Sequence, residues 1–356
     1  MSHFLQLHLL TSYPPANLNR DEQGRPKTAM MGGAQRLRVS SQSLKRAWRT
    51  SELFEEALAS HMGKRTKRIG VEACKRLMDQ DIKEKQANEW AASIATVFGK
   101  VEKGALETGQ LVHVGPEEWS AVNALVDTLA QEQRAPTKEE LDLLRKRPAA
   151  VDIGLFGRML AEHPSFNVEA ACQVAHAITV HAAEVEDDYF TAVDDLNTGD
   201  EHRGAAHVGE AGYGAGLFYL YLCIDRRLLE ENLNGDKALA DQAIVALTQA
   251  AARISPKGKQ NSFGSRAQAS YVLAESGDQQ PRSLSVAFLR PVRGEDMAGQ
   301  AITALEQQVE AFDGAYGPGA DRRFVLCAVP GVEAAKLSGA ERGNLDGLTR
   351  FITEQG

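Results

Sequence analysis

Strand-type segments in this chain are separated by a long helical stretch, and this division limits the folds open to it. Residues 3–10 alternate between apolar and polar side chains, which predicts a half-buried strand. Residues 61–150 are polar with helical apolar spacing, and Pro116 and Pro136 fit the starts of helices. Strand patterns return after this stretch. We therefore expect an α+β protein with a helical insertion in its sheet domain.

The other elements are predicted from the same periodicities. A long loop is expected over 11–33, a helix from near Ser40–Ser43 to about Ser60, and an extended hairpin or protruding loop over 187–214. A further helix is expected over 236–254. Short strands are expected at 36–40, 168–180, 217–224 and 271–275. Together these pieces predict a ferredoxin-like sheet with insertions.

Composition narrows the class and location of the protein. No apolar run approaches the roughly 20 residues that a membrane span requires, and the N-terminus lacks the features of a secretory signal. We therefore expect a cytoplasmic protein with no membrane partner. The four cysteines have no paired spacing, which predicts small buried residues without disulfides or zinc: Cys74, Cys172, Cys223 and Cys327.

A basic island covers residues 25–51 of a chain whose formal net charge is −8. It holds Arg25, Lys27, Arg36, Arg38, Lys45, Arg46 and Arg49 and no acid. A solvated helix face is the ordinary interpretation of such a run. The lack of acids and the polar sequence Ser40–Ser43 at a helix start favour contacts to nucleic-acid phosphates instead. A second basic stretch covers 255–270.

Candidate catalytic and metal-binding residues form no consistent site in the sequence. His176 and His181 are five residues apart, which places them on different faces of a helix or strand. The adjacent carboxylates Asp187–Asp188 and Asp194–Asp195 point to opposite faces of a strand. Asp21 could act as a general base for RNA cleavage, although a lone loop carboxylate is normally only solvated. We expect no catalytic residue, no bound metal and no cofactor.

Five segments, in order along the chain, resemble the CasC family, the repeated backbone subunit of the type I-E CRISPR Cascade complex. The segments are Leu18–Arg49, Asp152–Met159, Ala175–His181, Tyr189–Leu196 and Ala205–Leu233. The resemblance is weakest over 61–150 and at the C-terminus.

The resemblance implies a right-hand shape. Its palm, an RRM-like or ferredoxin-like sheet, would comprise residues 1–60, 151–182 and 215–356. A helical fingers insertion would occupy 61–150, and a β-hairpin thumb would occupy 183–214.

The resemblance also implies a non-catalytic role in antiviral defence. Copies of the subunit would polymerise along the CRISPR RNA as a helical oligomer, hold its phosphate backbone, and present guide bases for pairing with target DNA. Its other partners would be the large subunit, the small subunit and the subunits that bind the ends of the RNA. The alternative is a metal-dependent endoribonuclease backbone subunit of a CRISPR effector, acting through Asp21.

Residues for these roles are expected in the basic stretches and the shared segments. The expected RNA-binding residues are Asn19, Arg20, Lys27, Arg36, Arg38, Ser40, Gln42, Lys45, Arg46, Arg49, Arg158, Met159, Lys259 and Gln260. Met159 would wedge against bases. The base-displacing thumb residues would be Tyr189, Phe190, Val193 and Val208. The expected contacts to target DNA, from the fingers, are Lys138, Arg145, Lys146 and Arg147.

Overall fold

The computed structural model describes residues 2–192, 207–332, 337 and 339–354. Val193 and the side chain of Val208, both expected in the thumb, lie outside the described part. The chain divides into two units. The sheet unit comprises Met1–Ser51, Val174–Cys223 and Leu247–Gly356, and the helical unit comprises Glu52–Gln173 and Ile224–Ala246.

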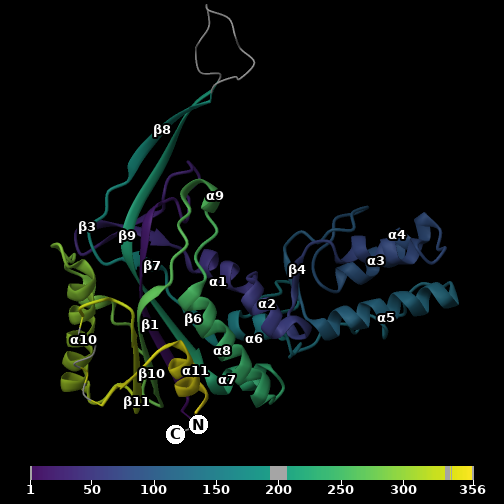
Figure 1. The fold of residues 1–356 in the computed structure, drawn as a ribbon. Helices are drawn as coiled ribbons and strands as arrows, with labels where there is room; N and C mark the ends of the chain where they lie inside the picture. The colour runs from purple at the N-terminus through teal and green to yellow at the C-terminus, as the bar shows by residue number, and fades with distance from the viewer. Residues whose placement is uncertain (1, 193–206, 333–336, 338, 355–356) are drawn as a thin grey trace, which may run out of the picture. The chain divides into compact units, whose positions relative to one another are not determined.

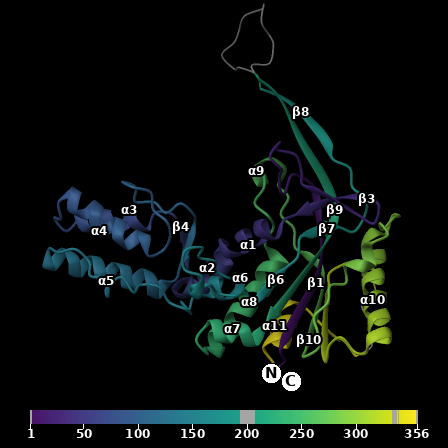
Figure 2. The same ribbon diagram turned by 180° about the vertical axis from the view of Figure 1, so that it is seen from behind.

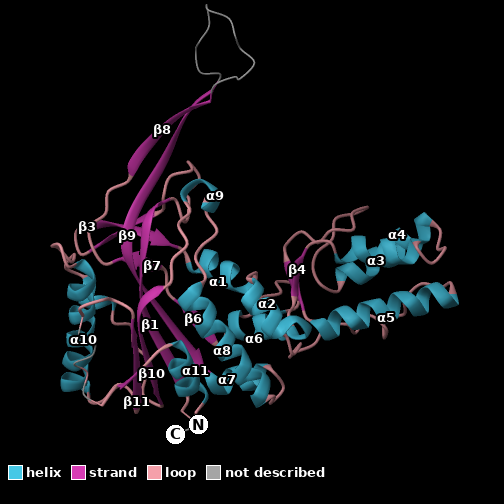
Figure 3. Cartoon of the chain, in the orientation of Figure 1, coloured by secondary structure: helices cyan, strands magenta, loops and turns pink. Residues whose placement is uncertain are grey.

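The sheet unit contains one large sheet, drawn with its strands as arrows in Figure 1 and in magenta in Figure 3. Among the described residues, the strand order is β12 (Glu341–Arg342), β11 (Arg322–Cys327), β10 (Ala269–Gly277), β1 (Phe4–Ala16), β9 (His207–Asp225), β7 (Ala177–Thr179), β3 (Ala34–Val39) and β2 (Thr28–Met31). β6 (Cys172–Val174) and β8 (Glu186–Ala192) also pair with β9. Among the described residues, β1–β10, β10–β11, β2–β3, β3–β7, β7–β9 and β8–β9 pair antiparallel, whereas β11–β12 is parallel.

The first strand differs from its prediction in length and burial. β1 continues to Ala16, and Gln6 and His8 are buried like the leucines that alternate with them, so the half-buried assignment is wrong. The predicted loop over 11–33 is also wrong at both ends, because β2 begins at Thr28. β1 runs through Pro14 and Pro15, and a proline fits a strand wherever its missing N–H is not needed for the ladder.

A buried polar network joins the central strands. His8 lies between the Tyr219 hydroxyl, 2.9 Å from Nδ1, and the Glu275 carboxylate, 3.1 Å from Nε2. Arg282 and Arg323 donate to the same carboxylate. Burial lowers the pKa of His8. Burial alone would raise the pKa of Glu275, but hydrogen bonds from His8 and Arg282 outweigh it and hold that pKa far below its usual range.

α10 (Met297–Tyr316) covers one face of the sheet, and the turn η3 (Ser285–Phe288) packs beside it, as two opposite views show (Figures 1 and 2). The sheet unit also contains α1 (Ser41–Arg49), α9 (Gln260–Phe263) and α11 (Leu345–Thr353). α8 (Lys237–Arg253), predicted over 236–254, crosses from the helical unit into the sheet unit.

The helix expected from about Ser40 to Ser60 is two helices. α1 ends at Arg49, and α2 (Glu52–Leu58) begins the helical unit. The hydroxyl of Thr50 donates to Arg46 O at 2.9 Å, and the hydroxyl of Ser51 donates to Trp48 O at 2.7 Å. These two hydroxyls bond to carbonyls of the last turn of α1. Such side-chain hydrogen bonds compete with the backbone hydrogen bonds that would continue the helix.

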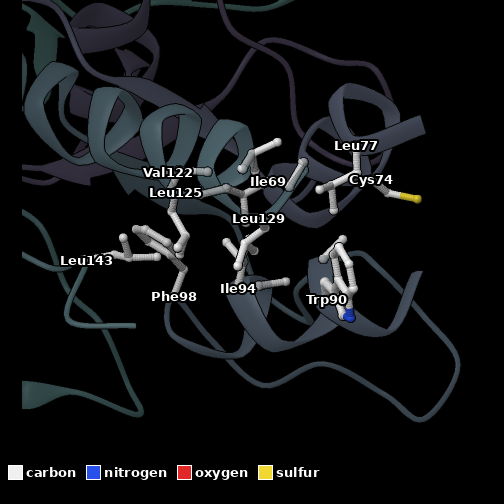
Figure 4. Close-up of a cluster of buried hydrophobic side chains, with 14 of the residues drawn as sticks. Ile69, Cys74, Leu77, Trp90, Ile94, Phe98, Val122, Leu125, Leu129 and Leu143 are labelled. Carbon is white, nitrogen blue, oxygen red and sulfur yellow. The ribbon is translucent and has the colours of Figure 1, made fainter. Parts of the chain in front are cut away.

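The helical unit has its own apolar core. It contains α3 (Ile69–Met78), α4 (Glu84–Thr96), α5 (Pro116–Glu132), α6 (Val151–Phe156), α7 (Arg226–Asn232), and a strand pair of β4 (Lys64–Thr66) and β5 (Val112–Val114). Figure 4 shows side chains of α3, α4 and α5 meeting in the core, with Trp90, Ile94 and Leu129 among them.

The helix predicted to start near Pro136 does not form. Thr137 and Glu140 form reciprocal backbone–side-chain hydrogen bonds, as at the start of a helix. Only a turn over 138–141 follows. The backbone after this turn is tied to α5 instead, because Arg145 N–H donates to the buried Glu118 carboxylate at 2.8 Å. Tertiary contacts therefore override a local helix signal.

Replacing Glu275 with Gln should lower the free energy of unfolding by about 3–5 kcal/mol, because it removes the more buried of the two carboxylates, with Asp313, that balance two largely buried guanidinium groups. Denaturant titration measures the change. Glu295→Gln, at an exposed carboxylate, is the matched control. Equal stability of the two variants would contradict the role of the network.

The same groups set a pH dependence. The folded-state pKa values of His8 and Glu275 both lie below their ordinary values of 6.5 and 4.5. Their contribution to the free energy of unfolding is therefore complete above those values. It is lost as the pH falls, first when His8 is protonated and then when Glu275 is protonated.

Candidate nucleic-acid interface

The N-terminus of α1 is held by two side chains. The Ser40 hydroxyl accepts from Ser43 N–H at 3.3 Å, which makes Ser40 the N-cap. The Asn19 amide oxygen accepts from Ser40 N–H at 2.8 Å, so the loop after β1 is bonded to the helix start. Both residues are among the expected RNA contacts, and in the structure their side-chain oxygens hold the start of α1, where Ser40 is buried. Gln42 follows them and is exposed.

The loop between β1 and β2 is an ordered structure. Asn17 donates to Gly24 O at 2.9 Å and to Gly212 O at 2.8 Å, which connects the loop to β9. The Asp21 carboxylate accepts from the backbone N–H groups of Gln23 and Arg25, each at 2.9 Å. Asp21 is therefore a turn-forming carboxylate here.

The second basic stretch packs against this loop. Ser255 closes its base through hydrogen bonds of 3.0 and 2.8 Å to the backbone of Ala267. Lys257 donates to Thr50 O at 2.9 Å, at the C-terminal end of α1. Gly258 approaches the first loop closely, since a Cβ there would lie 2.3 Å from Leu18 O.

Two clefts that share Arg20 lie between these loops. One, of about 280 Å³, is lined by Leu18, Asn19, Arg20, Ser43, Arg46, Ala47, Lys257 and Gly258. The other, of about 290 Å³, is lined by Arg20, Gln23, Gly24, Arg25, Asp187, Glu210, Ala211, Gly212 and Lys259. We call their joint surface the basic track. Its first cleft has three cationic side chains and no carboxylate in its lining.

Of the cations expected on α1, one lines the basic track. Arg46 is exposed and lines the first cleft, while Lys45 and Arg49 are partly exposed. Gln260 is partly engaged, since its amide nitrogen donates to Pro256 O at 2.7 Å. Of the expected RNA-binding residues, Arg20 and Arg46 line the first cleft together, and Arg20 and Lys259 line the second.

Arg36 is a correction to the expected RNA contacts. Its side chain is fully buried and donates to Thr179 O and Phe288 O, each at 2.9 Å. Burial lowers the pKa of its guanidinium. The guanidinium therefore links β3 to β7 and η3 through these hydrogen bonds, and the side chain cannot reach a phosphate at the surface.

Arg158 is a second correction. It is 5% exposed and pairs with Glu118 at 2.7 Å, and it also donates to Arg145 O and Phe166 O. The next residue, Met159, is 79% exposed. Arg158 therefore anchors the turn that presents Met159, within the helical unit.

Of the four residues expected to contact target DNA, two are bonded within the protein and two are exposed. Arg147 forms an ion pair with Glu231, and Arg145 donates to the carbonyls of Asp142 and Leu144, each at 3.0 Å. Lys138 and Lys146 are exposed.

The β8–β9 hairpin carries aromatic and acidic side chains. Tyr189 and Phe190 are 67% and 44% exposed. Asp187 pairs with Arg25 at 3.0 Å, which ties the root of the hairpin to the basic track. For Val208 the structure shows only the backbone, paired with Thr191.

Lys257 and Asn17 were missed by sequence reasoning. Lys257 belongs to the second basic stretch and could have been found from charge alone. Asn17 precedes the basic island and has no charge, so only the fold shows that it connects the loop to β9.

Within the described ranges, no group of three or more His, Cys, Asp or Glu residues is placed to hold a metal ion. In the same ranges, no helix has both the length and the apolar character of a membrane span.

These features define a mixed α+β protein with a cationic surface suited to a nucleic-acid backbone. The family model described as CT1975-like protein matches residues 5–350, so the chain belongs to the CT1975-like family of Cas proteins. A search of curated proteins finds no match.

Two solved structures are similar to this chain over nearly its whole length. One, titled "CRISPR RNA-guided surveillance complex, pre-nicking", has 29% sequence identity and a TM-score of 0.86, with 98% of this chain and 100% of that chain covered. The other, titled "CRISPR RNA-guided surveillance complex", has 25% identity and a TM-score of 0.74, with 98% and 99% covered. The mixed α+β fold is thus that of subunits of such complexes.

Gly258→Ala should separate the two loops that form the basic track, because its Cβ would overlap Leu18 O. We expect faster trypsin cleavage after Lys257 and Lys259 and a lower melting temperature. Gly314→Ala in α10, where a Cβ meets nothing within 4 Å, is the control. Unchanged cleavage relative to the control would contradict the close packing of the loops.

Proposed function

We propose that this chain is the non-catalytic backbone subunit of a type I-E Cascade, a CRISPR RNA-guided surveillance complex. Copies assemble along the CRISPR RNA, hold its phosphates, and leave guide bases open for pairing with target DNA. Family membership and the two similar structures support this role. Neighbouring copies, the large and small subunits and the subunits at the RNA ends are the proposed protein partners.

The basic track is the observation that carries the proposal. Its cations lie on two loops and on α1, while Asn19 and Ser40 hold the helix start in place. Such a surface contacts phosphates without reading bases, which suits a subunit whose RNA sequence is read by pairing. The proposed RNA contacts are the RNA-binding residues expected from the sequence, without Arg36 and Arg158. The guanidinium groups of these two arginines are bonded to buried oxygens of the protein.

The palm, fingers and thumb assignments remain part of the proposal. The large, mostly antiparallel sheet of the described residues supports a palm, and the α3–α5 core supports helical fingers. The exposed Tyr189 and Phe190 suit a base-displacing thumb, and the exposed Met159 suits a wedge. Lys138 and Lys146 are the proposed contacts to target DNA from the fingers.

Replacing Arg20 and Arg46 together with Gln should weaken RNA binding and reduce its salt dependence. Each lost phosphate contact on a single strand reduces the log–log slope by about 0.7, so the pair should reduce it by about 1.4. The measurement is the affinity of the full chain for single-stranded RNA over a range of salt concentrations. Arg342→Gln on β12, the strand at the opposite end of the sheet order from β2, is the matched control. A double variant with the wild-type slope would refute the assignment.

Asp21→Asn should change no nuclease activity. The amide oxygen can still accept from the backbone of Gln23 and Arg25, so the turn should persist while the negative charge is lost. The purified complex is incubated with guide-complementary RNA and a divalent metal. Metal-dependent products that form with the wild type and disappear with the variant would favour the endoribonuclease alternative.

A further inference from the structure

His176 is a polar residue beside the basic island that the proposed function leaves without a role. It precedes β7, and its chain neighbours are fixed in the sheet: Ala175 N–H bonds to a carbonyl of β9, and Ala177 pairs with Val39. Its exposed imidazole reaches back over β3, where Nδ1 lies 2.7 Å from Nη1 of Arg38.

The chemistry of this contact determines the state of the ring. A guanidinium can only donate, so Nδ1 of His176 must accept, and the imidazole is neutral with its proton on Nε2. Lys27 lies nearby, since its carbonyl accepts from Arg38 N–H at 2.8 Å. Although the residue is largely exposed, partial desolvation of the ring, then the charges of Arg38 and Lys27, lower the pKa of His176, which favours this neutral state.

The neighbouring strands add no opposing charge at the paired positions. β9 places Phe218 and Tyr219 opposite β7, and burial raises the pKa of the Tyr219 phenol, which keeps it neutral. β3 contributes Arg38, and the chain just before β2 contributes Lys27. The charged groups acting on the ring are therefore cations.

We propose that His176 is a positioning residue for RNA binding: its neutral imidazole holds the Arg38 guanidinium ready for a phosphate, and protonation of the ring releases it. An arginine that is already oriented loses less side-chain freedom when it binds. A protonated ring can no longer accept, and it repels both Arg38 and Lys27. The inference rests on the proposed function of the basic island.

A double-mutant cycle on the full chain tests the coupling, with an unstructured single-stranded RNA as the probe. At about pH 7.5, where the ring is neutral, His176→Ala should weaken binding about threefold. His176→Asn should bind like the wild type, because its carboxamide oxygen can accept from Arg38. In an Arg38→Gln background, His176→Ala should have no further effect.

The pH dependence provides a second, independent readout. The titration of His176 is followed by NMR, and affinities are measured above and below the observed pKa. Below that pKa the advantage of the wild type over His176→Ala should vanish, whereas that of His176→Asn should persist. Tighter binding by the wild type on protonation would instead make His176 a direct cationic contact, which overturns the proposal.

The remaining outcomes distinguish failure of the His176 inference from failure of the proposed function. An equal loss from His176→Ala with and without Arg38 would mean a purely structural role, and an Arg38→Gln variant of wild-type affinity would also overturn this inference alone. If the Arg38→Gln variant and the Arg20/Arg46 double variant both bind RNA like the wild type, the proposed function fails as well.

Discussion

The antiparallel pairing of β1 with β10 is the constraint on which the basic track depends. The register runs from Phe4 opposite Gly277 to Thr11 opposite Ala269. The end of β1 and the beginning of β10 therefore lie at the same end of the sheet. The first basic loop follows β1 and the second precedes β10, so two stretches more than 200 residues apart in the chain meet at one surface. The buried carboxylate of Glu275, bonded to His8 across the same pair of strands, stabilises this register.

The arginines of the chain perform two different tasks, and burial separates them. Arg36 and Arg158 are enclosed by carbonyl or carboxylate oxygens and fix the positions of nearby segments. Arg20 and Arg46 remain at the surface, where a phosphate can reach them. A planar guanidinium with five donors suits both tasks, which is why charge alone could not distinguish them.

Elements with strong local signals were predicted well. The helix predicted over 236–254 is α8, and the strand predicted over 271–275 lies within β10. The helix predicted after Pro136 failed because Glu118, in another helix, bonds the backbone at Arg145. The loop predicted over 11–33 is shorter than expected, because β1 continues through its prolines to Ala16 and β2 begins at Thr28. At Arg145 a contact from outside the local segment decided the structure.

The sequence by itself determined the class of the protein: an α+β chain with a helical insertion, a basic island within an acidic molecule, and segments resembling one family. These properties follow from local periodicity and charge, which need no tertiary information. The tertiary structure alone decided which cations face solvent, which residue holds Arg38, and that Asp21 forms a turn. Each of these depends on which distant donors and acceptors the fold brings within hydrogen-bond distance, and spacing along the chain does not encode that.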